Sequence, residues 1–160
     1  MAEGVQTIYG IVKGEQNAVK VPAPITASEV FRKLSGRFVT NNAGYMEVAD
    51  DGDTLLAGWM EYGGDNTSVS GDVMLWLPAY LNMSVVFRIP VQAGTYVLAM
   101  LGKTTDIVRA TLNGVTNVQG AKLDASGEDN LIIVGGDLVG NKYVDVCFNP
   151  SKLTGFSGVV

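Results

Sequence analysis

Short strand-like runs, separated by clusters of Gly, Asn and Asp, recur along almost the whole chain. The runs are rich in Val, Ile, Thr and aromatic residues, which is typical of β-strands. No helical pattern lies between them, so we expect antiparallel pairing rather than βαβ units. The runs are VQTIYGIV, DVMLWL, SVVFRIPV, TYVLAML, TDIVRATL, NLIIVGGDLV and KYVDVCF. The sequence therefore predicts an all-β fold, either an antiparallel sandwich or a barrel.

The first 24 residues are expected to form an extended N-terminal arm. Pro22 and Pro24 flank Ala23, and prolines at this spacing exclude a central strand and favour an edge or extended conformation. We therefore divide the chain into an arm, residues 1–24, and a β domain, residues 25–160.

One segment inside the β domain is compatible with a short helix. In TASEVFRKL, Thr26 and Glu29 have the spacing of a capping box, and the segment is long enough for one or two turns. Further along, NNAG (41–44) and DDGD (50–53) have turn composition and separate two strands. A stretch of small polar residues at 62–71 marks the place for any subdomain boundary.

Three motifs suggest chemistry, but each is better explained as a turn or loop. Asp50, Asp51 and Asp53 lack the ligand spacing of a calcium-binding EF-hand, so we expect a solvated turn. The pair formed by Glu128 and Asp129 resembles the two carboxylates of a glycoside hydrolase. It lies in a Ser-Gly-Glu-Asp-Asn stretch, where we expect a solvated loop.

The tripeptide Gly102-Lys103-Thr104 matches the end of a nucleotide-binding P-loop. That motif needs a glycine five residues before the Gly-Lys pair, where this chain has Val97. The flanking residues alternate as strands do, so the sequence predicts a turn joining two strands, with Lys103 in solvent.

Composition narrows the functional classes further. The chain has no histidine and one cysteine, Cys147, so an internal disulfide and every histidine-dependent catalytic or zinc site are excluded. Cys147 lies in the alternating run KYVDVCFNP and is expected to be a small buried residue. We expect no enzymatic activity, no cofactor and no metal.

Charge and hydropathy indicate which classes of partner the chain can bind. Residues 1–40 carry five basic and three acidic side chains, a balance of +2, and residues 41–160 carry six and thirteen, a balance of −7, which together give the net −5. No basic stripe with interleaved aromatics exists, so nucleic acid is not an expected partner. The longest apolar run, VMLWLPAYL, is too short to cross a bilayer, and MAEGVQTIYG lacks the features of a signal peptide. We expect no membrane partner and synthesis in a cytoplasm.

Assembly with other protein surfaces is expected as well. The chain is 47% hydrophobic and only 17% charged, and apolar surface on a folded protein marks interaction sites.

Several segments resemble virion structural proteins of tailed bacteriophages. The segments GTYVLAMLGKTTDIV and VQGAKLDASGEDNLIIVGGDLVGNKYVDVCFNPSKL contain the turns of that pattern. The front segments YGIVKGEQNAVKVPAP and KLSGRFVTNNAGYMEVADDGD resemble phage head-decoration (cement) proteins, which begin with an extended arm. The residues that match the pattern are Gly102 to Asp106, Gln119-Gly120, Asp124 to Asp129, Val134 to Asp137 and Val144 to Pro150.

The resemblance implies a structural virion protein on the exterior of an icosahedral capsid, which it stabilises by repeated contacts with the major capsid protein. It also implies a homo-oligomer, with a trimer favoured. An extended arm can add to the sheet edge of a neighbour through its backbone, so we expect capsid contact along the arm. The candidate contact residues are Val5, Ile8, Tyr9, Ile11, Val12, Lys13, Val19, Lys20 and Val21.

Two alternatives remain at this point. The first is a carbohydrate- or cell-surface-binding β-sandwich, in which Trp59, Tyr62, Trp76 and Tyr80 would stack on sugars; the competing expectation is that both tryptophans belong to the core. The second is a tail or baseplate structural protein, which would have a similar sequence.

Overall fold

The protein is described here from a computed structural model, over residues 10–14, 19–29, 37–60, 69–72, 74–79, 85–112, 115–124 and 127–153. Nearly all regular structure in these ranges is β-strand, and the two short helical segments are 3₁₀ turns, η2 (Leu98–Met100) and η3 (Pro150–Lys152). The prediction of an all-β fold is therefore confirmed, and the barrel is the architecture that forms.

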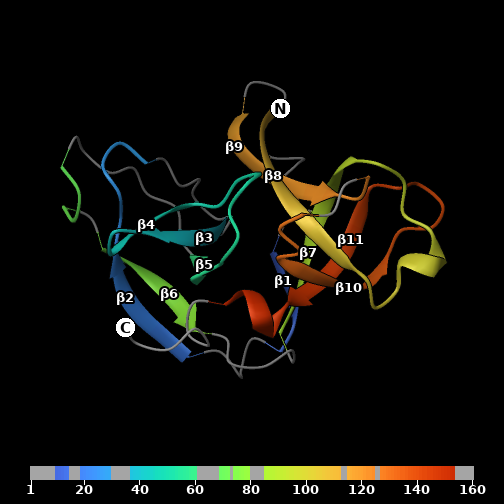
Figure 1. Cartoon of the computed structure of the whole chain (residues 1–160), viewed down its shortest axis with the longest axis horizontal. Helices are drawn as coiled ribbons and strands as arrows, with labels where there is room; N and C mark the ends of the chain where they lie inside the picture. Colours follow the sequence, from blue (N-terminus) through green and yellow to red (C-terminus); the bar gives the residue numbers. More distant parts are fainter. Residues whose placement is uncertain are drawn as a thin grey trace.

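Five strands close into a barrel at one side of the molecule (Figure 1). They are β7 (Val86–Ala93), β8 (Thr104–Leu112), β9 (Val115–Lys122), β10 (Leu131–Gly136) and β11 (Tyr143–Phe148). The order is β7-β11-β10-β8-β9. The barrel closes where β9 returns to β7 in a short parallel pairing, Val91 opposite Ala121. Strand β1 (Gly10–Lys13) pairs antiparallel with the other half of the same edge of β7.

Two smaller sheets form the other side of the molecule (Figure 1). The first has the order β4-β3-β5, from β3 (Arg37–Asn42), β4 (Tyr45–Val48) and β5 (Gly58–Met60). The second pairs β2 (Val19–Pro24) with β6 (Met74–Ala79). Pro22 and Pro24 therefore lie in a two-stranded sheet, which consists of edge strands, in agreement with the sequence.

One hydrophobic core is shared by the barrel and the three-stranded sheet. Phe38 and Trp59, from the three-stranded sheet, pack on Phe87 and Phe148 of the barrel. The ring centroids lie 4.8 to 5.5 Å apart, mostly edge to face, which is the favoured geometry for aromatic pairs. Trp59 is 2% exposed, so its expected place in the core is confirmed. It therefore offers no platform for a sugar.

The side chain of Gln119 joins the barrel to the three-stranded sheet. It is fully buried, accepts a hydrogen bond from the Phe38 N–H and donates to the carbonyls of Phe38 and Ala49, each at 2.8 Å. The next residue must be glycine, because a Cβ on Gly120 would lie 2.1 Å from the Gln92 side chain and 2.8 Å from the Pro90 carbonyl oxygen. The Gln-Gly pair thus closes the barrel and attaches the second sheet.

The NNAG and DDGD turns form as predicted. Ala43 and Gly44 adopt positive φ between β3 and β4, and residues 51–52 form a turn after β4. The segment that forms β9, VTNVQGAK, was not predicted to be a strand. The run TYVLAML was predicted as a strand, and this was wrong: it contains η2, and Val97, Leu98 and Leu101 are exposed.

Part of the expected N-terminal arm belongs to the folded β domain. Residues 10–13 and 19–24 are strands paired with β7 and β6 of the same chain, so these two stretches do not form a detached arm. Residues 1–9 and 15–18 lie outside the described residues. Most of the expected helix at 26–34 and most of the boundary at 62–71 lie outside them as well.

Candidate functional site

The candidate contact residues fall into two groups that the structure does not place in one sheet. Ile11, Val12 and Lys13 belong to β1, and Ile11 packs against the main core while Val12 is 42% exposed. Val19, Lys20 and Val21 belong to β2, and their side chains lie outside the described residues, as do Val5, Ile8 and Tyr9.

A second surface was not predicted from the sequence. Among the described residues, eight large hydrophobic side chains are exposed, and six of them come from two neighbouring segments at one end of the barrel. We call these six the barrel-end surface: Val97, Leu98, Leu101, Val134, Leu138 and Val139. A concentration of exposed aliphatic side chains at one place marks an interaction site more strongly than scattered ones do.

The turn at residues 137–142 presents Leu138 and Val139 at its tip. The Asp137 carboxylate accepts hydrogen bonds from the N–H groups of Val139, Gly140 and Lys142. These bonds hold the pKa of Asp137 below its ordinary value, so the group stays ionised at neutral pH. Leu138 is 56% and Val139 100% exposed. A fixed turn therefore holds two aliphatic side chains in water.

The segment that carries η2 is fastened to this turn. Asn141 accepts a hydrogen bond from the Tyr96 N–H at 2.7 Å and donates to the Gly94 carbonyl at 3.1 Å. Gly136 lies against the Tyr96 ring, where a Cβ would be 2.7 Å from ring carbons. The Gly102 N–H also donates to the Ile133 carbonyl at 2.8 Å. These contacts hold the η2 segment and the 137–142 turn, which carry the barrel-end surface, next to each other (Figure 1).

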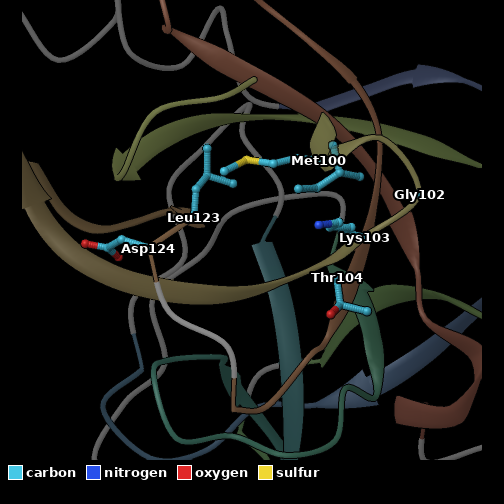
Figure 2. A pocket seen from close by; sticks show the side chains of 7 residues that line it. Met100, Gly102, Lys103, Thr104, Leu123 and Asp124 are labelled. Carbon is cyan, nitrogen blue, oxygen red and sulfur yellow. The ribbon is translucent and has the colours of Figure 1, made fainter. Parts of the chain in front are cut away.

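An open pocket of about 580 Å³ lies next to η2 (Figure 2). Met100, Leu123 and Ile133 give it apolar walls, and Lys103 and Asp124 stand on opposite sides of it. We call it the end pocket; its lining residues are Met100, Gly102, Lys103, Thr104, Leu123, Asp124 and Ile133.

The Gly102-Lys103 stretch forms a turn, as predicted, with Gly102 at φ +80° and Lys103 exposed. The turn joins η2 to β8, however, and not two strands.

Three carboxylates from separate segments meet around Asp106 of β8. Asp51, Asp106 and Glu128 place one oxygen each within 4.8 Å of one another. A side-chain hydrogen bond to the Asp106 carboxylate, followed by desolvation and repulsion from Asp106, raises the pKa of Glu128. Lys122 lies 2.7 Å from Asp51, and this hydrogen bond raises the pKa of the lysine. The Asp129 N–H also donates to Asp106 at 2.6 Å.

These contacts correct two expectations. The DDGD turn is not simply solvated, because Asp50 accepts a hydrogen bond from the Arg109 N–H at 2.9 Å in addition to the Lys122–Asp51 ion pair. The Glu128–Asp129 stretch is not a solvated loop either, because Thr104 donates to Asp129 at 2.7 Å and Asp106, paired with Glu128, is 2% exposed. The ammonium of Lys122 and the Asp129 N–H offset the negative charge of the cluster, and we assign no metal to it.

Cys147 is 2% exposed, as predicted, and burial raises the pKa of its thiol. A thiol held in the neutral form in an apolar core is a poor nucleophile.

The barrel-end surface was missed because TYVLAML has the composition of a buried strand. The spacing of the two glycines that flank this run would have indicated the loop. Gly94 and Gly102, both at positive φ, bracket seven residues, a length that suits a loop carrying a single turn of helix.

Comparison with known proteins gives no assignment: no family model matches the chain, and no curated protein or solved structure is significantly similar to it. Within the described residues, no helix has the length and apolarity required to span a bilayer.

Proposed function

We propose that the chain is a structural protein of a tailed-phage virion, bound to the exterior of the capsid through the major capsid protein. The proposal rests on the resemblance of its turn motifs to head-decoration proteins, and it assigns no reaction to the chain. Self-association, with a trimer favoured, belongs to the same proposal.

The observation that carries the proposal is the position of β1 at the end of the six-stranded sheet. One edge of β1 pairs with β7, and within the described residues its other edge pairs with no strand. An edge strand offers a row of backbone donors and acceptors to a strand of a partner. Val12 and Lys13 are exposed beside that edge. Capsid contact therefore runs along the outer edge of β1.

Substitution of Val12 by Glu tests this contact. Val12 is 42% exposed, so the change leaves the core intact but places a charge on the edge, which opposes strand addition. Heads from the encoding phage, made with this gene deleted, are mixed with purified protein and sedimented. We expect occupancy to require at least about tenfold more Val12→Glu protein than wild type, a difference of about 1.4 kcal/mol.

The matched control is Val69→Glu, because Val69 is a similarly exposed valine, at 56%, in a segment away from β1. It is expected to decorate heads as the wild type does. Wild-type protein that fails to sediment with heads contradicts the capsid function. Equal occupancy by all three proteins contradicts the role of the β1 edge.

A further inference from the structure

The barrel end carries both a projecting tip and a hollow that suits it. The tip is the pair Leu138 and Val139, which the hydrogen bonds of Asp137 hold in water. The hollow is the open end pocket of about 580 Å³, in which Met100, Leu123 and Ile133 form an apolar part beside the polar Lys103, Thr104 and Asp124. That volume has room for two aliphatic side chains, each of which occupies on the order of 100 Å³ by close-packing standards.

The charges around the tip and around the pocket are complementary. Lys103 and Asp124 line the pocket and are exposed, and neither forms an ion pair within the described residues. The tip has the same two signs, from Asp137 at its start and Lys142 at its end. A tip entering a pocket of another copy can therefore place Asp137 near Lys103 and Lys142 near Asp124. Opposite charges around an apolar contact fix its register.

We propose that the 137–142 turn of one copy inserts Leu138 and Val139 into the end pocket of a second copy of this chain. The contact joins two different surfaces, so each copy keeps one free tip or pocket until a closed ring or a reciprocal pair uses them all. The net charge of −5 opposes association of two copies elsewhere on their surfaces, and the local pairing of charges offsets this at the barrel end. This contact stands whether or not the chain belongs to a virion.

Light scattering of the purified full chain across a concentration series tests the contact. The wild type is expected to show a mass that is a multiple of 16.9 kDa. The tip variant is Leu138→Ser with Val139→Ser, and the pocket variant is Lys103→Glu with Asp124→Lys. All four positions are exposed, so both variants are expected to fold. Loss of two buried aliphatic side chains is expected to weaken association at least about 100-fold.

Mixing the two variants makes the test specific. Each variant alone is expected to be monomeric, but a mixture retains one intact tip and one intact pocket and is expected to form a pair of twice the monomer mass. The control is Val69→Ser, which removes an exposed valine elsewhere and is expected to assemble as the wild type does.

Three results would overturn the proposal. They are a monomeric wild type, assembly that survives in the tip variant, and variants that remain separate on mixing. A monomeric wild type whose tip variant loses binding to phage heads would assign the tip to another protein, which also overturns the second copy as occupant. The sedimentation experiment with Val12→Glu decides the capsid function separately.

Discussion

Gln119 connects parts of the chain that are 70 and 81 residues apart in sequence. Its amide bonds three buried backbone groups, two on Phe38 and one on Ala49, and the Phe38 carbonyl also accepts from the Ala49 N–H. Buried backbone groups need such partners, because leaving one unpaired costs free energy comparable to a lost hydrogen bond.

Substitution of Gln119 by Ala is expected to destabilise the fold by about 2 kcal/mol or more, because the Phe38 N–H and the Ala49 carbonyl lose this partner at a cost of roughly 1–3 kcal/mol each. The Phe38 carbonyl keeps its bond from the Ala49 N–H. Urea denaturation gives the free energy of unfolding. Asn42→Ala serves as control, since it removes an exposed hydrogen bond to Glu47. A Gln119→Ala protein as stable as the control would show that the amide is replaceable.

Glu128 links stability to pH. The hydrogen bond to Asp106 raises the pKa of Glu128 above its ordinary value of 4.5, so the folded state favours the protonated acid. The stabilisation that protonated Glu128 gives to the folded state is therefore fully present below the pKa that Glu128 has in the unfolded chain. It is lost as pH rises through the pKa that Glu128 has in the folded protein.

Glu128→Gln keeps a hydrogen-bond donor without the charge. We expect it to melt at the same temperature as the wild type at pH 4 and at a higher temperature at pH 7, where the wild-type carboxylate faces Asp51 and Asp106. Asp72→Asn, at an exposed acid outside this cluster, provides the comparison, with no such change in pH dependence. A wild type whose stability relative to Glu128→Gln does not fall between pH 4 and pH 7 would contradict the assigned coupling.

At the scale of elements, the parallel contact of β9 with β7 closes the barrel. Gly120 makes that approach possible, because a Cβ there would collide with the backbone oxygen of Pro90 as well as with Gln92. A collision with backbone cannot be relieved by a rotamer change.

Gly120→Ala is therefore expected to destabilise the protein by about 3 kcal/mol, at the upper end for overpacking, or to prevent folding. Gly127→Ala is the matched control, since its Cβ would meet no atom closer than 3.8 Å. Circular dichroism during thermal denaturation compares the two. Equal melting temperatures would contradict the close approach of the strands.

The strands of the barrel were largely predictable, because alternation and turn residues are local signals. β8, β10 and β11 formed where those signals placed them. β9 was missed since VTNVQGAK has few large apolar residues, and its position depends on packing against β7. η2 was misread because a run of apolar residues does not show whether a partner strand covers it.

The site was less predictable than the fold. The charges that meet in the carboxylate cluster are up to 77 positions apart in sequence, from Asp51 to Glu128. The local sequence around either residue does not indicate that the two side chains are in contact. The exposure of Leu138 and Val139 likewise depends on how Asp137 folds the turn beneath them. Each of these features is a product of tertiary contact.

For the whole molecule, the shared aromatic core makes the barrel and the three-stranded sheet a single cooperative unit. Phe38 contacts Trp59, Phe87 and Phe148, and so neither side can lose its structure without exposing rings of the other. Small domains with one core unfold in a single transition.

We expect backbone circular dichroism and Trp59 fluorescence, recorded in a Trp76→Phe background, to report one coincident transition in urea. Phe38→Ala is expected to lower the free energy of unfolding by about 3–5 kcal/mol and to shift both signals together. Two separate transitions would indicate that the barrel and the smaller sheet unfold independently.

Because β7 pairs with β11, whose last residue is Phe148, the barrel cannot be completed until the chain as far as Phe148 has emerged from the ribosome. The nascent chain meanwhile carries Phe87 and Ile89 without their eventual cover. Contacts between residues so distant along the chain form slowly, and exposed apolar strands are then open to aggregation. Barrel closure therefore follows the synthesis of β11, and chaperones have access to β7 until then.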